Sequence, residues 1–424
     1  MRENNTNEQS ESRVCYESLE GWAREKMQGW IQDILEQEIT DLLRRQKSER
    51  RAGHGLIDTP LGSRNGHGKP RKMGMMNGTV TVRRPRVRDL EERFESKILP
   101  LFKRQSKEVR DMLPELYLHG LSSGDFELAM RGLLGEGAPL SASSIQRLKA
   151  KWELEFDSWK KQDLSSLEAV YFWADGIYVK AGIEDRKSAL LVIIVALSNG
   201  EKHIVACESG ERESKESWLK ILRDLKARGL KFPKLSVADG ALGLWSALGE
   251  IHPTGDEQRC WNHKITNVLD DLPKKEQPKA AELLKEMPYC ATKVLCEEKR
   301  DEFASRYRKS DPKAVATLLR DWDRMVSFYS FPEAHWRHLR TSNIVESPFS
   351  AIRLRTDASR RYKRVEGAKA MIWKLLTVAE KSWRRLNAPE LLPLVARGVK
   401  FKDGIEMKRK ESKLEEYQLE EIAA

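Results

Sequence analysis

Three acidic residues stand where they could do chemistry on a phosphate ester. Asp175 interrupts an apolar run, with YFWA before it and GIYV after it, and Asp239 ends the short run SVAD. Glu346 follows much later, in SNIVES. Carboxylates at close range repel each other unless a divalent cation lies between them, and Mg²⁺ prefers oxygen ligands. The three acids therefore predict a two-Mg²⁺ site, with Mn²⁺ expected to substitute, that activates water or a hydroxyl against a phosphodiester.

Each acid also has a simpler explanation. An aspartate beside glycine at a strand end can cap the next helix, and Asn343 and Glu346 have the spacing of a capping box. Ser347 followed by Pro348 is an alternative helix start. A basic cluster behind Glu346 favours the catalytic interpretation, because it suits a helix laid against a DNA backbone. The cluster consists of Arg353, Arg355, Arg360, Arg361, Lys363 and Arg364.

The elements that must position these acids form an α/β pattern. From residue 167, three apolar, β-branched runs separated by short polar turns predict an antiparallel meander. A helix follows and ends near Gly229, and then come the strand before Asp239 and another helix. This order predicts a ribonuclease-H-like core. Its first and fourth strands would be neighbours, so that Asp175 and Asp239 face each other.

A charged, helical segment at 273–338 divides the predicted core into two parts, 165–272 and 339–390, and a charged tail covers 391–424. Apolar residues from Val315 to Tyr329 recur at helical spacing and include Trp322. A tryptophan on such a face predicts core packing. The alternative is a base-stacking side chain near the cleaved DNA.

The region before the core predicts DNA binding. We divide it into a helical and basic, glycine-rich part at 1–105 and a trihelical, helix-turn-helix-like part at 106–160. Residues 51–110 hold 15 Lys or Arg against 6 Asp or Glu. Phosphate contacts are therefore expected from four arginines of the strand-like PRVRD region. These are Arg83, Arg84, Arg86 and Arg88. A helical linker without DNA contact is the alternative for 106–160.

Composition narrows the class of protein. The chain has 424 residues, 40% hydrophobic and 33% charged, which excludes wholesale disorder and fits several globular domains. A formal charge of +11 points to an anionic partner, with DNA ahead of a membrane surface. The longest apolar run, 189–197, is too short to span a bilayer, and the first ten residues are too polar for a signal peptide. Five cysteines without a CxxC pair favour reduced thiols, so we expect a cytoplasmic protein acting on the nucleoid.

Several short motifs together resemble the Mutator-type bacterial insertion-sequence transposases. They are RNG at 64–66, PRVRD at 85–89, ADGIYVK around Asp175, VADG at Asp239, QRCWNH at 258–263 and TSNIVES around Glu346. The resemblance implies a DDE triad of Asp175, Asp239 and Glu346, and a ribonuclease-H-like domain interrupted by an all-helical insertion. Asn343 of TSNIVES belongs to the same signature.

The resemblance also matches Cys260 and His263 to a C/D-x2-H signature. These two residues could bind zinc together with His335 and His338, but the two pairs lie far apart in sequence. We expect instead that they form a hydrogen-bonding pair that supports the strand beside Asp239.

The predicted function is transposition. The protein would bind terminal inverted repeats, cleave DNA strands with Mg²⁺ and join the 3′ ends to target DNA, acting as a homo-oligomer. A ribonuclease-H-like nuclease without strand transfer is the enzymatic alternative. A transposase-derived DNA-binding protein without catalysis is the other.

Overall fold

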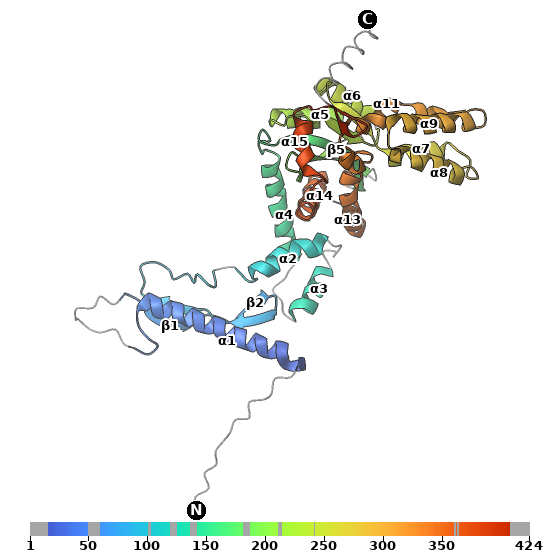
Figure 1. Cartoon of the computed structure of the whole chain (residues 1–424). Coiled ribbons are helices and arrows are strands. Elements are labelled where there is room, and N and C mark those ends of the chain that lie inside the picture. Colours follow the sequence, from blue (N-terminus) through green and yellow to red (C-terminus); the bar gives the residue numbers. More distant parts are fainter. Residues whose placement is uncertain are drawn as a thin grey trace, which may run out of the picture. The chain divides into compact units, whose positions relative to one another are not determined.

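The computed structural model describes residues 16–49, 60–100, 103–118, 125–135, 142–180, 187–210, 214–240, 242–359, 362 and 364–407. The chain forms two compact units, residues 1–146 and 147–424, and each is described by itself (Figure 1). Within the described residues, no helix is both long and apolar enough to cross a membrane.

The first unit packs one long helix on short strands. Helix α1 (Tyr16–Leu43) lies against β3 (Gly78–Val82), and Leu35 joins Val80, Val82 and Leu99 in a small core. The other strands are β1 (Ser63–His67), β2 (Arg71–Met75) and β4 (Pro85–Arg88). Antiparallel pairs form between β1 and β4 and between β2 and β3. The two strands of the TVTVRRPRVRD region, β3 and β4, therefore pair with β2 and β1 and not with each other.

Three helices follow, as predicted for 106–160: α2 (Lys107–Leu118), α3 (Asp125–Leu134) and α4 (Ala142–Trp159). The boundary between the units falls inside α4, so this region is not a unit of its own. The end of α4 belongs to the second unit because it packs on α14 (Val365–Glu380). The rings of Phe156 and Trp159 lie 5.6 and 5.7 Å from the ring of Trp373 in that helix.

The second unit contains a five-stranded sheet in the order β7-β6-β5-β8-β9. Strands β5 (Ala169–Lys180), β6 (Lys187–Leu197) and β7 (Lys202–Gly210) are antiparallel, which confirms the predicted meander. Strands β8 (Leu235–Ala238) and β9 (Asp256–Arg259) run parallel to β5. The first and fourth strands are neighbours, as expected, and the chain is of the mixed α/β class.

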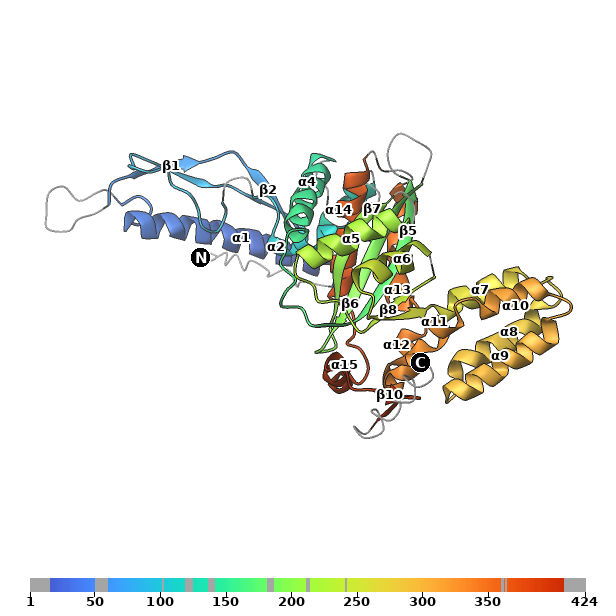
Figure 2. The ribbon, with the colours of Figure 1, turned by 90° about the horizontal axis from the view of Figure 1, so that it is seen from above.

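Helices cover both faces of this sheet (Figure 2). Helices α5 (Lys215–Ala227) and α6 (Leu242–Ile251) bury Trp218, Leu222 and Trp245 against Phe172 and Ala174 of β5. Side chains alternate along a strand, so Tyr171, Trp173 and Asp175 project from the opposite face. That face is covered by α13 (Asn343–Ser359) and α14.

A helical segment connects β9 to α13. Its helices are α7 (Trp261–Asp270), α8 (Gln277–Glu286), α9 (Lys293–Tyr307), α10 (Pro312–Leu319), α11 (Trp322–Val326) and α12 (Trp336–Leu339), with 3-10 turns η1 (Met287–Tyr289), η2 (Ser327–Ser330) and η3 (Glu333–His335). The helices thus begin at Trp261, before the expected position 273. The apolar spacing over 315–329 suggests one helical face, but the structure has two helices there. The chain turns at Arg320 and at Asp321, whose φ is 58°. The structure after α14 consists of η4 (Pro389–Leu391), α15 (Leu392–Ala396), β10 (Phe401–Lys402) and β11 (Ile405–Glu406).

Candidate active site

Asp175 and Asp239 occupy matching positions on neighbouring parallel strands. Ala174 of β5 is paired with Ala238 of β8, and each aspartate is the next residue along its chain. Both alanines belong to the core under α5 and α6, so alternation directs both aspartates toward the face that α13 covers. Neighbouring strands lie ~4.8 Å apart. The predicted juxtaposition of the two acids is therefore a property of the sheet register.

Glu346 lies in the first turn of α13, which packs on β5. The backbone amides of Val345 and Glu346 donate to Ser342 O at 2.9 and 3.1 Å, so the helix begins just after Ser342. Ser342 Oγ donates a hydrogen bond to Glu346 Oε1. Ser342 thus occupies the capping position next to Asn343, and Pro348 lies inside the helix. The hydrogen bond holds the Glu346 carboxylate at the start of α13.

Cys260 ties this helix start to the sheet. Its backbone amide donates to Ala238 O at 2.7 Å, and its Sγ accepts a hydrogen bond from Ser342 N at 3.3 Å. His263 Nδ1 lies 3.7 Å from Glu346 Oε1. In the part of the chain that the structure describes, Cys260, His263 and Glu346 are the one group of three metal-ligating side chains whose ligand atoms all lie within 4.8 Å of one another. Cys260 therefore connects the end of β8 to the helix that carries Glu346, and the predicted hydrogen bond between Cys260 and His263 stays a prediction.

A four-ligand zinc site with His335 and His338 is not formed. His335 Nδ1 lies 2.8 Å from the hydroxyl of Tyr171, and its Nε2 lies 3.1 Å from Ala388 O. His338 Nε2 accepts a hydrogen bond from Asn387 N at 3.5 Å. Each imidazole has its own partner, a buried tyrosine for His335 and the backbone of the exposed Asn387 for His338, and neither belongs to the group of ligand atoms around Cys260.

The electrostatic environment of His263 favours its charged form. Its interaction with the Cys260 sulfur, together with the charges of Glu346 and Asp239, raises the pKa of His263 to about 9, although burial opposes the shift. The imidazole is therefore cationic at neutral pH. It places a positive charge beside the predicted catalytic acids.

Arg259, which the sequence analysis did not single out, supports Asp239 from behind. Its Nε donates to Asp239 O at 3.2 Å, and its Nη1 forms an ion pair of 3.1 Å with Asp321. Gly240 has a φ of +104°, and the guanidinium of Arg259 fills the space that a Cβ there would need. Arg259 thus connects the end of β8 to the point where the helical segment turns.

The basic cluster behind Glu346 is only partly on the surface. Arg353 is exposed, and Arg364 is exposed but lies 3.3 Å from Glu153 of α4. Arg355 is 2% exposed, so the prediction that it contacts DNA is wrong. The reason is helical geometry, since residues two apart point about 200° from each other. Arg360, Arg361 and Lys363 lie outside the described residues.

Three of the four arginines near β4 are available at the surface. Arg83, Arg86 and Arg88 are exposed, and Arg88 forms a 3.5 Å ion pair with Asp89. Arg84 is half-buried and donates from Nη2 to Phe94 O at 3.0 Å, while its guanidinium lies over the Phe94 ring. Arg84 therefore holds the fold of the first unit.

Trp322 lies in the core, which confirms the predicted burial. It is 7% exposed, its ring packs edge-on against Trp261 at 5.8 Å, and the Arg300 guanidinium lies 4.8 Å from its centre. A base cannot stack on a ring enclosed in this way.

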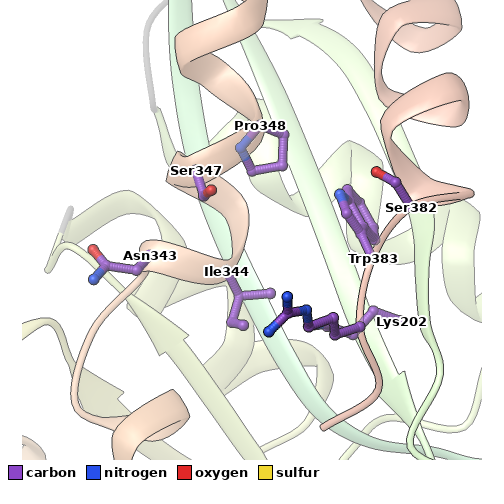
Figure 3. A pocket seen from close by; sticks show the side chains of 8 residues that line it. Lys202, Asn343, Ile344, Ser347, Pro348, Ser382 and Trp383 are labelled. Carbon is purple, nitrogen blue, oxygen red and sulfur yellow. The ribbon is translucent and has the colours of Figure 1, made fainter.

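A small pocket of about 220 Å³ lies beside the start of α13 (Figure 3). Ile344 and Pro348 of α13 form one side of it, and Lys202 and Trp383 lie across from them. Arg384 also lines the pocket. An indole with two cationic side chains is a surface on which a nucleic acid strand can bind.

Comparison with known proteins places the chain in a family. The sequence profile described as "Transposase, Mutator family" matches residues 1–385. The chain is 43% identical over 301 residues to the transposase of insertion sequence element IS6120 from Mycolicibacterium smegmatis, covering 70% of this chain and 92% of that protein. It is 41% identical over 279 residues to the transposase of IST2 from Acidithiobacillus ferrooxidans, covering 65% and 94%.

Among solved structures, the HTLV-2 integrase catalytic core domain in complex with magnesium is matched with a TM-score of 0.17 and 16% identity, covering 29% of this chain and 86% of that one. The family assignment rests on the sequence relatives and on the profile that spans most of the chain. The protein belongs to the Mutator family of insertion-sequence transposases.

Proposed function

We propose that this transposase is a DDE enzyme that binds the terminal inverted repeats of its element, cleaves DNA strands with Mg²⁺ and joins the 3′ ends to target DNA. The register of Ala174 with Ala238 carries the proposal, because it sets Asp175 and Asp239 side by side under the helix that bears Glu346. The strand order β7-β6-β5-β8-β9 supports a ribonuclease-H-like core.

The donor chemistry of these residues fits Mg²⁺, although the three acids are not among the groups of described residues whose ligand atoms all lie within 4.8 Å of one another. Asp175, Asp239 and Glu346 offer only carboxylate oxygens, and the two aspartates stand on adjacent strands at one edge of the sheet. When bound, the two cations lower the pKa of the attacking water or hydroxyl and stabilise the charge on the leaving oxygen. Glu346 would exchange its Ser342 partner to join the two aspartates.

The chain's own residues orient the reacting groups. In cleavage, a water oxygen bonds to phosphorus and the bond from phosphorus to the 3′ oxygen breaks; the water loses a proton to solvent, and the departing 3′ oxygen takes up a proton to become a hydroxyl. In joining, the freed 3′ hydroxyl loses its proton and bonds to a target phosphorus, and the displaced 3′ oxygen of the target takes up a proton. His263 lies beside Glu346, with 3.7 Å between Nδ1 and Oε1, and its imidazole would orient this carboxylate in both steps.

DNA contacts are proposed on both units. The exposed Arg83, Arg86 and Arg88 serve the first unit, and Arg353 with the pocket of Lys202 and Trp383 serves the second. The helical segment between β9 and α13 is proposed as the family's insertion, anchored to the core by Arg259 and Asp321. All of these contacts would be weakened by salt.

The test uses the full-length protein, a DNA duplex carrying the ends of its element, a target plasmid and Mg²⁺, followed by sequencing of the products. Joined 3′ ends support the proposal. Cleavage without joining would leave the nuclease alternative, and specific binding with no cleavage would leave the non-catalytic DNA-binding protein.

A further inference from the structure

Helix α1 carries a second apolar stripe whose side chains stay exposed in the part of the chain that the structure describes. Its members Leu19, Trp22, Trp30 and Ile34 are 47%, 45%, 73% and 47% exposed. The face that packs on β3 is a different one and buries Leu35, Ile39 and Leu43. At 100° per residue the two faces point in nearly opposite directions. An exposed stripe with two tryptophans indicates an interaction surface.

The face of α1 that bears the stripe also carries a line of residues with the spacing of a helix that packs on another helix. Leu19, Trp22, Lys26, Gly29 and Asp33 follow one another at intervals of three and four residues. Gly29 lies in the middle of the helix with nothing within 4 Å of the place where its Cβ would be. Glycine costs ~1 kcal/mol relative to alanine inside a helix, and no close contact within the unit explains it. A glycine at this point would let a second backbone or a large ring approach closely.

The charges on the stripe favour a protein partner over DNA. Lys26 is the exposed cation, and its Nζ lies 5.7 Å from the centre of the Trp22 ring. Asp33 and Asp41 are exposed acids on the same face. A phosphate backbone would meet more negative than positive charge there. The chain's first fifteen residues, MRENNTNEQSESRVC, are too polar to cover an apolar stripe.

A second copy of the same helix is complementary to its charges and to the open space beside Gly29. If two α1 helices run antiparallel with a two-fold axis between positions 29 and 30, residue i faces residue 59 − i. Lys26 then faces Asp33 of the second copy, and Asp33 faces its Lys26. Trp30 faces Gly29 of the second copy, where there is room for the indole. A closed two-fold contact of this kind is the commonest form of self-association.

We propose that the protein forms a homodimer through this antiparallel packing of α1 against α1. The contact is independent of the catalytic acids and of any DNA ligand. It is expected at micromolar protein concentration without DNA, because one helix pair makes a modest interface.

The experiment measures the mass of the full chain in solution by sedimentation, without DNA, over a range of protein concentrations. The wild-type protein is expected at twice its monomer mass of 48.9 kDa. Lys26→Asp and Asp33→Lys should each be monomeric, because like charges then face each other twice. An equimolar mixture of the two variants should dimerise again, since opposite charges face each other in the mixed pair.

Gly29→Leu separates packing from folding. Leucine favours the helix more than glycine does, so a loss of dimer cannot come from a weakened helix, and the dissociation constant should rise at least about tenfold. Gly21→Leu is the matched control, because Gly21 is exposed on the same helix, away from the stripe, with open space around it. A monomeric wild-type protein, a mixture that stays monomeric, or a Gly29→Leu variant that dimerises like wild type would each overturn the proposal.

Discussion

Arg259 and Asp321 form an ion pair of 3.1 Å between the last strand of the sheet and the turn before α11. The same guanidinium donates to the backbone oxygen of Asp239 at 3.2 Å. A movement of the helical segment would therefore reach the backbone of a predicted catalytic acid through a single side chain.

Loss of this link should have two measurable effects. Arg259→Gln leaves Asp321 partly buried with one cationic partner fewer, and we expect a loss of ~3 kcal/mol in the free energy of unfolding by urea. Adding Asp321→Asn should recover part of this loss. Arg259→Lys keeps the charge but removes the Nε donor, so strand cleavage should need more Mg²⁺ while the protein stays folded. An unchanged Mg²⁺ requirement would limit Arg259 to a structural role.

The catalytic acids are tested one at a time. Asp175→Asn, Asp239→Asn and Glu346→Gln should each lower strand cleavage at least about a thousandfold, or about 4 kcal/mol in activation free energy, because each removes a metal ligand. Binding to the element's ends should stay near wild type, since most of the affinity comes from phosphates contacted elsewhere. Asp157→Asn, at an exposed position of α4, is the control. Efficient cleavage by any one of the three variants would remove that residue from the site.

The arginines near β4 should separate into two classes. Replacing Arg83, Arg86 and Arg88 with alanine should reduce the slope of log K against log salt by up to ~3 for binding to the terminal repeats. Arg84→Ala should instead lower the melting temperature, because Arg84 donates to Phe94 O. Filter binding at several salt concentrations measures the first effect and a thermal melt the second. An unchanged salt slope in the triple variant would place the phosphate contacts elsewhere.

Trp322 should matter for stability. Trp322→Ala leaves a cavity beside Trp261 and Arg300 and should cost ~3 to 5 kcal/mol of unfolding free energy. Leu319→Ala is the control in the same segment, because Leu319 is 39% exposed. A Trp322→Ala protein with a normal melting temperature and defective cleavage would favour base stacking.

Stability should also depend on pH through His203. Its Nδ1 lies 2.9 Å from Glu380 of α14, and this hydrogen bond raises the pKa of the imidazole in the folded state. A raised folded-state pKa means that the contribution is complete below the unfolded pKa of about 6.5 and is lost as the pH rises through the folded value. The difference in unfolding free energy between wild type and His203→Gln should therefore shrink from about pH 6 upward. A difference that grows with pH would contradict this assignment.

The sequence analysis worked best where apolar runs are long. The apolar run of β6 is unbroken, that of β5 is interrupted by Asp175, and β7 has an apolar centre from Ile204 to Cys207 between polar ends. The pairing of these strands and the position of β8 could therefore be predicted. Strand β9 was missed, because its sequence DEQR is wholly polar and it becomes a strand only by pairing with β8. The break at Arg320 and Asp321 was also missed, because the apolar positions on both sides keep one helical phase.

The candidate site shows the same division. The aspartates could be predicted because a charge in an apolar strand is itself a signal. The contacts of Ser342 with Cys260 and Glu346 depend on where α13 enters the fold, and no local pattern reports that. The burial of Arg355 could not be predicted for the same reason, since the sequence shows a basic cluster but not which of its residues faces the core.

The close fit of Arg259 over Gly240 links two positions that lie in different strand–helix junctions. No side chain at 240 can coexist with the guanidinium in its present place, and the φ of +104° excludes most residues independently. Among descendants of this element, substitutions at 240 and 259 should therefore be inherited together. A drifting copy that loses the glycine first would lose the support of Asp239 before it loses any of the three acids.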